Sequence, residues 1–139
     1  AGSWVYVGGL GSCNVAKLAR QIVVACYIAA VAEALTFAKK AGTDPKLVFE
    51  AIKGGLAGST VMNAKAPMML ERNFKPGFRI ELHIKDLNNA LNAAHAISAP
   101  VPLTGQVMEM MQVLKADEHQ KEDHSSLVKF YEKISNVEL

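Results

Sequence analysis

The chain has 139 residues, of which 50% are hydrophobic, and its formal net charge is +2 with histidine neutral. This length suits one domain with a real hydrophobic core, and the near balance of charge excludes the basic surface on which nucleic-acid binding depends. We therefore expect a single domain over residues 1–139 and no nucleic-acid partner.

Only Trp4–Val7 has the character of a strand, and a glycine-rich stretch follows it. Gly9 and Gly11 match the start of the dinucleotide-binding pattern G-x-G-x-x-G, but Asn14 stands where the third glycine belongs. A long helix and then another helix follow, so no βαβ unit is available to hold a nucleotide. We infer that these glycines let the chain turn sharply into the long helix.

The long helix is predicted over residues 14–41, which contain neither proline nor glycine and are rich in good helix formers. We expect Ser12 or Asn14 to cap its start and Gly42 to end it. Its apolar run, Ile22–Ala32, is shorter than the roughly 20 residues that span a bilayer. The sequence therefore predicts a central, buried helix and no membrane partner.

The rest of the chain repeats the pattern of cap, helix and stop. Asp44 followed by Pro45 is typical of a helix start. The further predicted helices are residues 45–53, 59–73 with an interruption at Pro67, 80–97, 107–114 and 125–134. The predicted fold class is all-α, with one long helix packed against about five shorter helices and at most one short N-terminal strand.

Cysteine and histidine residues give no firm site of their own. Cys13 and Cys26 are predicted to be reduced thiols of a cytoplasmic protein, because their placement is poor for a disulfide. His119 and His124 lie in an acidic segment, but their spacing is loose for a metal site. We favour a solvated loop there and expect no metal. His83 lies two residues before Lys85 on a predicted helix, so we expect its side chain to point away from that lysine.

Lys17 lies close to the start of the long helix. The positive pole of a helix dipole disfavours a charged ammonium, and this suits a lysine that exchanges protons in catalysis. The spacing by itself nevertheless favours a simpler interpretation, in which the alkyl chain of Lys17 covers apolar surface.

Five motifs follow one another along the chain. They are G-x-x-G-S-x-N-x-x-K-L from Gly8 to Leu18, Glu33-Ala34-Leu35, Gly54-Gly55-Leu56-Ala57-Gly58-Ser59, Phe78-Arg79-Ile80 and Ile84-Lys85-Asp86-Leu87. In order and spacing they resemble the β-hydroxyacid dehydrogenase family, from about Val5 to Leu139. Members have an N-terminal Rossmann domain and a helical C-terminal domain opened by a long interdomain helix. The resemblance implies that this chain is the helical domain and lacks the Rossmann domain.

The resemblance also assigns expected roles to single residues. It implies that Lys17 is the catalytic acid and base, and that Lys85 reaches NAD or NADP near its nicotinamide end. Three residues after the lysine, where the family usually has asparagine, this chain has Arg20, followed by Gln21. We expect both residues to bind substrate, with Arg20 on the same side of the helix as Lys17. The guanidinium of Arg20 is suited to bind a substrate carboxylate through two hydrogen bonds. It would equally obstruct the site.

The partners implied by the resemblance are a small hydroxyacid substrate, the Rossmann domain of the same protein and further copies of the chain, as a dimer or a tetramer. The alternative is a helical oligomerisation or interaction module without enzymatic activity. A Rossmann domain encoded directly upstream of Val5 would favour the enzyme domain over the non-enzymatic module.

Overall fold

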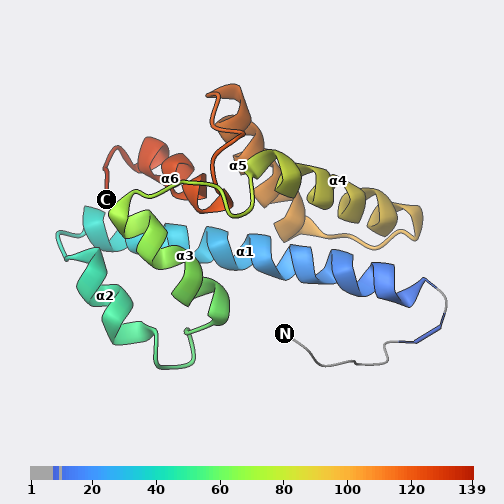
Figure 1. The fold of residues 1–139 in the computed structure, drawn as a ribbon, viewed down its shortest axis with the longest axis horizontal. Helices are drawn as coiled ribbons and strands as arrows, with labels where there is room; N and C mark the ends of the chain where they lie inside the picture. Colours follow the sequence, from blue (N-terminus) through green and yellow to red (C-terminus); the bar gives the residue numbers. More distant parts are fainter. Residues whose placement is uncertain (1–7, 10) are drawn as a thin grey trace.

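The computed structural model describes residues 8, 9 and 11–139, and this part of the chain is all-α, as predicted (Figure 1). Trp4–Val7, the predicted strand, lies outside the described residues. The elements are α1 (Ser12–Lys40), α2 (Pro45–Ile52), α3 (Thr60–Glu71), α4 (Ile80–Ala96), α5 (Pro102–Ala116), the short 3-10 helix η1 (His124–Leu127) and α6 (Val128–Ser135).

The long helix α1 is the centre of the fold and contacts every other helix. In Figure 1, α4 runs alongside its N-terminal half, whereas α2 and α3 lie by its C-terminal half. Most of the largest fully buried side chains either come from α1 or come from helices that contact it. Among them are Ile28, Leu35, Met69, Ile80, Leu87, Met111, Leu114 and Leu127. The prediction of a central, buried long helix is therefore confirmed.

The two ends of α1 differ in how well the sequence predicted them. Gly42, just past the last turn, has a φ of 85° and donates its N–H to the carbonyl of Lys39 at 3.0 Å, as expected of a glycine stop. The predicted caps at the start, Ser12 and Asn14, are wrong, because both residues lie inside the helix. Gly11 precedes it with a φ of 88°, a conformation that favours glycine.

Side-chain caps begin α2 and α3, and the first of them, at Asp44, was predicted. The carboxylate of Asp44 accepts a hydrogen bond from the N–H of Lys46 at 2.9 Å. The hydroxyl of Ser59 accepts one from the N–H of Met62, also at 2.9 Å. Each cap satisfies an N–H that has no partner within its helix.

Pro67 does not interrupt α3, contrary to the prediction. The helix continues to Glu71 and buries Met62, Ala66 and Met69 against its neighbours, α1 among them. A proline inside a helix removes one hydrogen bond and crowds the preceding turn. The packing of this buried face therefore outweighs a local penalty that is visible in the sequence.

Two boundaries in the second half of the chain also differ from the prediction. Helix α5 begins at Pro102, several residues before the predicted start, because a proline is well tolerated at the first helical position. The predicted helix 125–134 is divided into η1 and α6.

The outer face of α1 leaves a stripe of apolar side chains exposed. Val23, Tyr27 and Phe37 are 51%, 42% and 62% exposed, and the small residues Ala30 and Ala34 complete the stripe. These positions are three and four residues apart, which is the spacing of helices that pair with other helices. We call residues 23, 27, 30, 34 and 37 the apolar stripe of α1.

By length and composition alone, the part of α1 from Asn14 to Lys40 is long and apolar enough to cross a membrane. The expectation that the apolar run Ile22–Ala32 is too short to span a bilayer therefore does not decide whether α1 could cross a membrane. Half of its most apolar window is buried within the fold, and the core helix of a soluble protein meets the same criteria.

Candidate functional site

A polar pocket lies between α1 and α4, beside Lys17, the lysine for which the family resemblance implied a catalytic role. The pocket has a volume of about 270 Å³. Lys17 is exposed and borders it from the second turn of α1. The effect of the helix dipole is confined to the first turn of a helix. Because α1 begins at Ser12, Lys17 lies in the second turn, beyond that effect. The lining residues are Asn14, Lys17, Leu18 and Gln21 from α1, and Asp86, Asn89, Asn92 and Ala93 from α4.

A hydrogen bond between the two helices forms one wall of this pocket. The side-chain nitrogen Nε2 of Gln21 donates to Oδ2 of Asp86 at 2.6 Å. A carboxylate only accepts hydrogen bonds, so the amide nitrogen of Gln21 must be the atom that faces Asp86. The amide oxygen of Gln21 is then the atom left to accept a hydrogen bond from a ligand. Gln21 itself is buried, with 8% of its surface exposed.

Asp86 was not among the residues predicted to form a site. It directly follows Lys85 in the Ile84-Lys85-Asp86-Leu87 motif, and that neighbourhood is the only signal in the sequence that points to it. The contact that gives it a role joins residues 65 positions apart, and no local pattern predicts such a distance.

Arg20 and Lys85 are both exposed, and neither is among the lining residues of the pocket. Arg20 is three residues from Lys17, so the two side chains leave α1 on neighbouring parts of its surface. Lys85 is four and seven residues before Asn89 and Asn92, so it shares a face of α4 with two residues that line the pocket. Of the four predicted site residues, Lys17 and Gln21 thus line the pocket, and Arg20 and Lys85 do not.

Asp123 lies at the centre of a buried polar cluster that also includes Lys65. Its side chain is fully buried, accepts hydrogen bonds from the N–H groups of Gly77, Phe78 and Ser125 at 2.9–3.0 Å, and lies 3.2 Å from Nζ of Lys65. Burial by itself raises the pKa of this carboxyl, but these hydrogen bonds outweigh it and lower the pKa from 3.8 to about 2. Asp123 is therefore ionised and holds three chain segments together.

The solvated loop predicted around His119 and His124 is wrong for His124. That residue is 5% exposed, and its Nδ1 lies 2.9 Å from Nδ1 of the fully buried His83. His119 lies nearer the surface, with Nδ1 2.9 Å from the carboxylate of Glu122. Within the described residues, no group of three side chains suited to hold a metal ion occurs.

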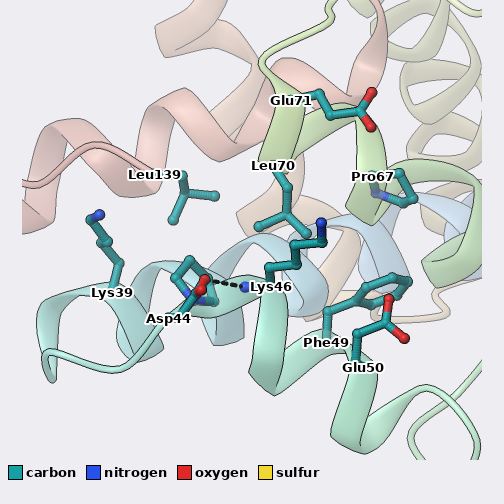
Figure 2. Close-up of a pocket in the computed structure, with 10 residues that line it drawn as sticks. Lys39, Asp44, Lys46, Phe49, Glu50, Pro67, Leu70, Glu71 and Leu139 are labelled. Carbon is teal, nitrogen blue, oxygen red and sulfur yellow. Dashed lines mark hydrogen bonds between the residues drawn. The ribbon is translucent and has the colours of Figure 1, made fainter.

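A second cavity, of about 460 Å³, lies at the other end of α1 (Figure 2). It is bordered by α2, α3 and the C-terminal end of the chain. Charged residues on its border include Lys39, Asp44, Lys46 and Glu71, around apolar residues such as Phe49 and Leu70. None of the predicted site residues lines this cavity.

The fold and the first pocket define an α-helical domain with a polar site between two of its helices, beside an exposed lysine. A family model described as the NAD-binding domain of NADP-dependent 3-hydroxyisobutyrate dehydrogenase matches residues 11–131. The chain belongs to this family of NAD(P)-dependent hydroxyacid dehydrogenases. The resemblance that the motifs indicated is thereby confirmed.

Individual relatives agree with this assignment. The chain is 44% identical over 133 residues to 2-hydroxy-3-oxopropionate reductase from Escherichia coli, covering 96% of this chain and 46% of the relative. It is 29% identical to 2-(hydroxymethyl)glutarate dehydrogenase from Eubacterium barkeri, covering 95% and 44%. The solved structure of Mycobacterium tuberculosis 3-hydroxyisobutyrate dehydrogenase with L-serine has a TM-score of 0.83 and 28% identity, covering 91% of this chain and 46% of that one. The chain thus spans about half the length of these relatives.

Proposed function

We propose that this chain is the helical domain of a nicotinamide-dependent reductase that interconverts tartronate semialdehyde, also called 2-hydroxy-3-oxopropionate, with D-glycerate or a similar small 3-hydroxyacid. The name of the E. coli relative, 2-hydroxy-3-oxopropionate reductase, at 44% identity, supports this substrate. Because the chain spans 46% of that relative, we further propose that a Rossmann domain elsewhere in the protein binds NAD or NADP. Residues of that domain decide between the two cofactors.

The position of Lys17 at the pocket between α1 and α4 is the observation that carries this proposal. Its ammonium is suited to give a proton to the carbonyl oxygen of a bound aldehyde during reduction, and the neutral amine to take the proton back in the reverse reaction. The amide oxygen of Gln21 is available for a substrate hydroxyl, and the guanidinium of Arg20 for its carboxylate.

The size of the pocket fits a small acid and leaves most of a dinucleotide outside. At about 270 Å³, it falls below the range of roughly 300–1,000 Å³ typical of sites for drug-sized ligands. A nicotinamide cofactor, when bound, supplies the hydride. Lys85, exposed on the face of α4 that leads into the pocket, is placed to contact the part of the cofactor nearest the substrate.

A chimeric enzyme tests the proposed function. In the E. coli reductase, the segment that matches this chain is replaced by the chain itself. We expect the chimera to oxidise NADH or NADPH when tartronate semialdehyde is supplied, measured by absorbance. The isolated chain should be folded and helical by circular dichroism but without turnover, because the described residues contain no dinucleotide fold. A folded chimera without turnover, or an isolated chain with turnover, would contradict the proposal.

We also propose that the chain self-associates through the apolar stripe of α1. An exposed apolar patch on a small domain favours pairing with a partner, and two-fold dimers are the commonest closed assembly. Light scattering coupled to size exclusion, over a tenfold dilution series, should give a dimer mass, or else a tetramer mass.

Two variants locate this contact. Tyr27→Glu combined with Phe37→Glu places charges in the stripe and should shift the mass towards the monomer. Leu56→Glu is the matched control, because Leu56 is fully exposed in the connection between α2 and α3, away from the stripe. A monomer mass for the unmodified chain at every concentration would show that the stripe needs no partner.

A further inference from the structure

Two histidines far apart in the sequence form a buried pair beneath the pocket. His83 is on α4 and is fully buried, and His124 opens η1 and is 5% exposed. Their Nδ1 atoms are 2.9 Å apart. On the other side of its ring, Nε2 of His83 lies 3.3 Å from the backbone carbonyl oxygen of Gln21 on α1. The ring of Phe78 packs against both imidazoles, with centroids 5.5 and 5.3 Å away.

The hydrogen positions in this pair follow from the chemistry of the acceptor at its end. A carbonyl oxygen only accepts hydrogen bonds, so Nε2 of His83 carries a proton. In neutral His83, Nδ1 then has a free lone pair. Nδ1 of His124 must therefore carry a proton and donate it to His83. The order of donors is thus from His124 to His83 to the carbonyl of Gln21.

The surroundings keep both rings neutral. Burial lowers the pKa of His83 and of His124 from the ordinary 6.5, and the ammonium of Lys65 lowers that of His124 further, to about 3. Asp123 and Asp86 act in the opposite direction, on His124 and His83 respectively. Lys65 itself lies 3.2 Å from both carboxylate oxygens of Asp123. At neutral pH the pair therefore keeps the single arrangement of hydrogens described above.

Gln21 of α1 is in contact with both the histidine pair and the pocket: its backbone is bonded to His83, and its side chain forms part of the pocket wall. The carbonyl of Gln21 accepts from His83, while its side chain donates to Asp86 at 2.6 Å. Asp86 is three residues after His83, so the two bonds are neighbouring links between α1 and α4. Gln21 is also four residues after Lys17, on the same side of α1.

We propose that His83 is a positioning residue for the reaction, which holds Gln21 and thereby the pocket wall in place, and that His124 sets the tautomer in which His83 does so. This inference rests on the proposed function for its link to catalysis. Its structural part, the hydrogen-bonded link from His124 through His83 to the backbone carbonyl of Gln21, does not depend on any reaction.

Magnetic resonance of the chain tests the structural part. Imidazole nitrogen shifts should show a protonated Nε2 on His83 and a protonated Nδ1 on His124. In His83→Leu, the side-chain amide signal of Gln21 should move. In His83→Gln, it should return towards its original place, because glutamine offers an acceptor to His124 and a donor to the carbonyl of Gln21. A protonated Nδ1 on His83, or an unmoved Gln21 signal in His83→Leu, would overturn the proposal.

The chimeric enzyme tests the link to catalysis. His83→Leu should raise the KM for the aldehyde by about fivefold or more, the scale of one lost hydrogen bond, while His83→Gln should stay near the unmodified value. Leu114→Ala, a core change in α5 away from the pocket, controls for lost stability and should leave KM unchanged. An unchanged KM in His83→Leu, or an equal rise in all three variants, would reduce His83 to a structural role. An unmodified chimera without turnover would instead contradict the proposed function.

Discussion

Lys17→Ala in the chimeric enzyme should lower kcat by a factor of about 10² or more, the usual contribution of a general acid or base. Alanine leaves no group to exchange a proton with the carbonyl oxygen of the substrate. Lys17→Arg should be nearly as slow, because a guanidinium keeps the positive charge but does not give up its proton. Steady-state kinetics at saturating aldehyde and cofactor measure both variants.

Two other lysines serve as comparisons for Lys17. Lys46 is exposed on α2 and borders the second cavity (Figure 2), so Lys46→Ala should leave kcat unchanged. Lys85→Ala should raise the KM for the cofactor more than it lowers kcat, since we place Lys85 beside the cofactor. A Lys17→Ala enzyme with nearly normal kcat would remove this residue from the mechanism.

Asp123→Ala should destabilise the chain by about 3–5 kcal/mol, the scale measured when one partner of a buried ion pair is removed. The change leaves Lys65 without its carboxylate and three backbone N–H groups without their acceptor. Urea unfolding followed by circular dichroism, at one fixed chain concentration, measures the free energy of unfolding.

Asp117→Ala is the matched control. Its carboxylate makes an exposed ion pair with Lys133 at 2.9 Å, and such pairs contribute about 1 kcal/mol or less. An equal loss of unfolding free energy in Asp123→Ala and Asp117→Ala would contradict the proposal that Asp123 stabilises the fold more than an exposed ion pair does.

The same carboxylate predicts an acid dependence with a definite sign. The pKa of Asp123 is lower in the folded chain, at about 2, than its ordinary value of 3.8. Its stabilisation should therefore be complete above about pH 4 and be lost as the pH falls towards about 2. Over that interval, the stability difference between the unmodified chain and Asp123→Asn should shrink by roughly 2 kcal/mol. A difference that stays constant from pH 5 to about pH 2 would contradict the lowered pKa.

The helices, the cap at Asp44 and the stop at Gly42 were predictable, because their signals are local. Asp44 and Ser59 cap the helices that follow them, and Gly42 ends α1 through its positive φ. Local signals failed where packing outweighed them, as in the continuous helix through Pro67. Lys17 and Gln21 could be proposed as site residues only through the family resemblance, since a lysine near a helix start has no chemistry that its spacing reveals.

By itself, the sequence determined the all-α class, the long central helix and the family, because these depend on composition, on the order of helix signals and on motifs along the chain. The tertiary structure alone decided that Asp86 meets Gln21, that His83 meets His124, and that an acidic segment expected in solvent buries Asp123. The physical reason is distance along the chain. These contacts join residues 41 to 65 positions apart, and a polar residue of such a pair looks like a surface residue until its partner is placed beside it.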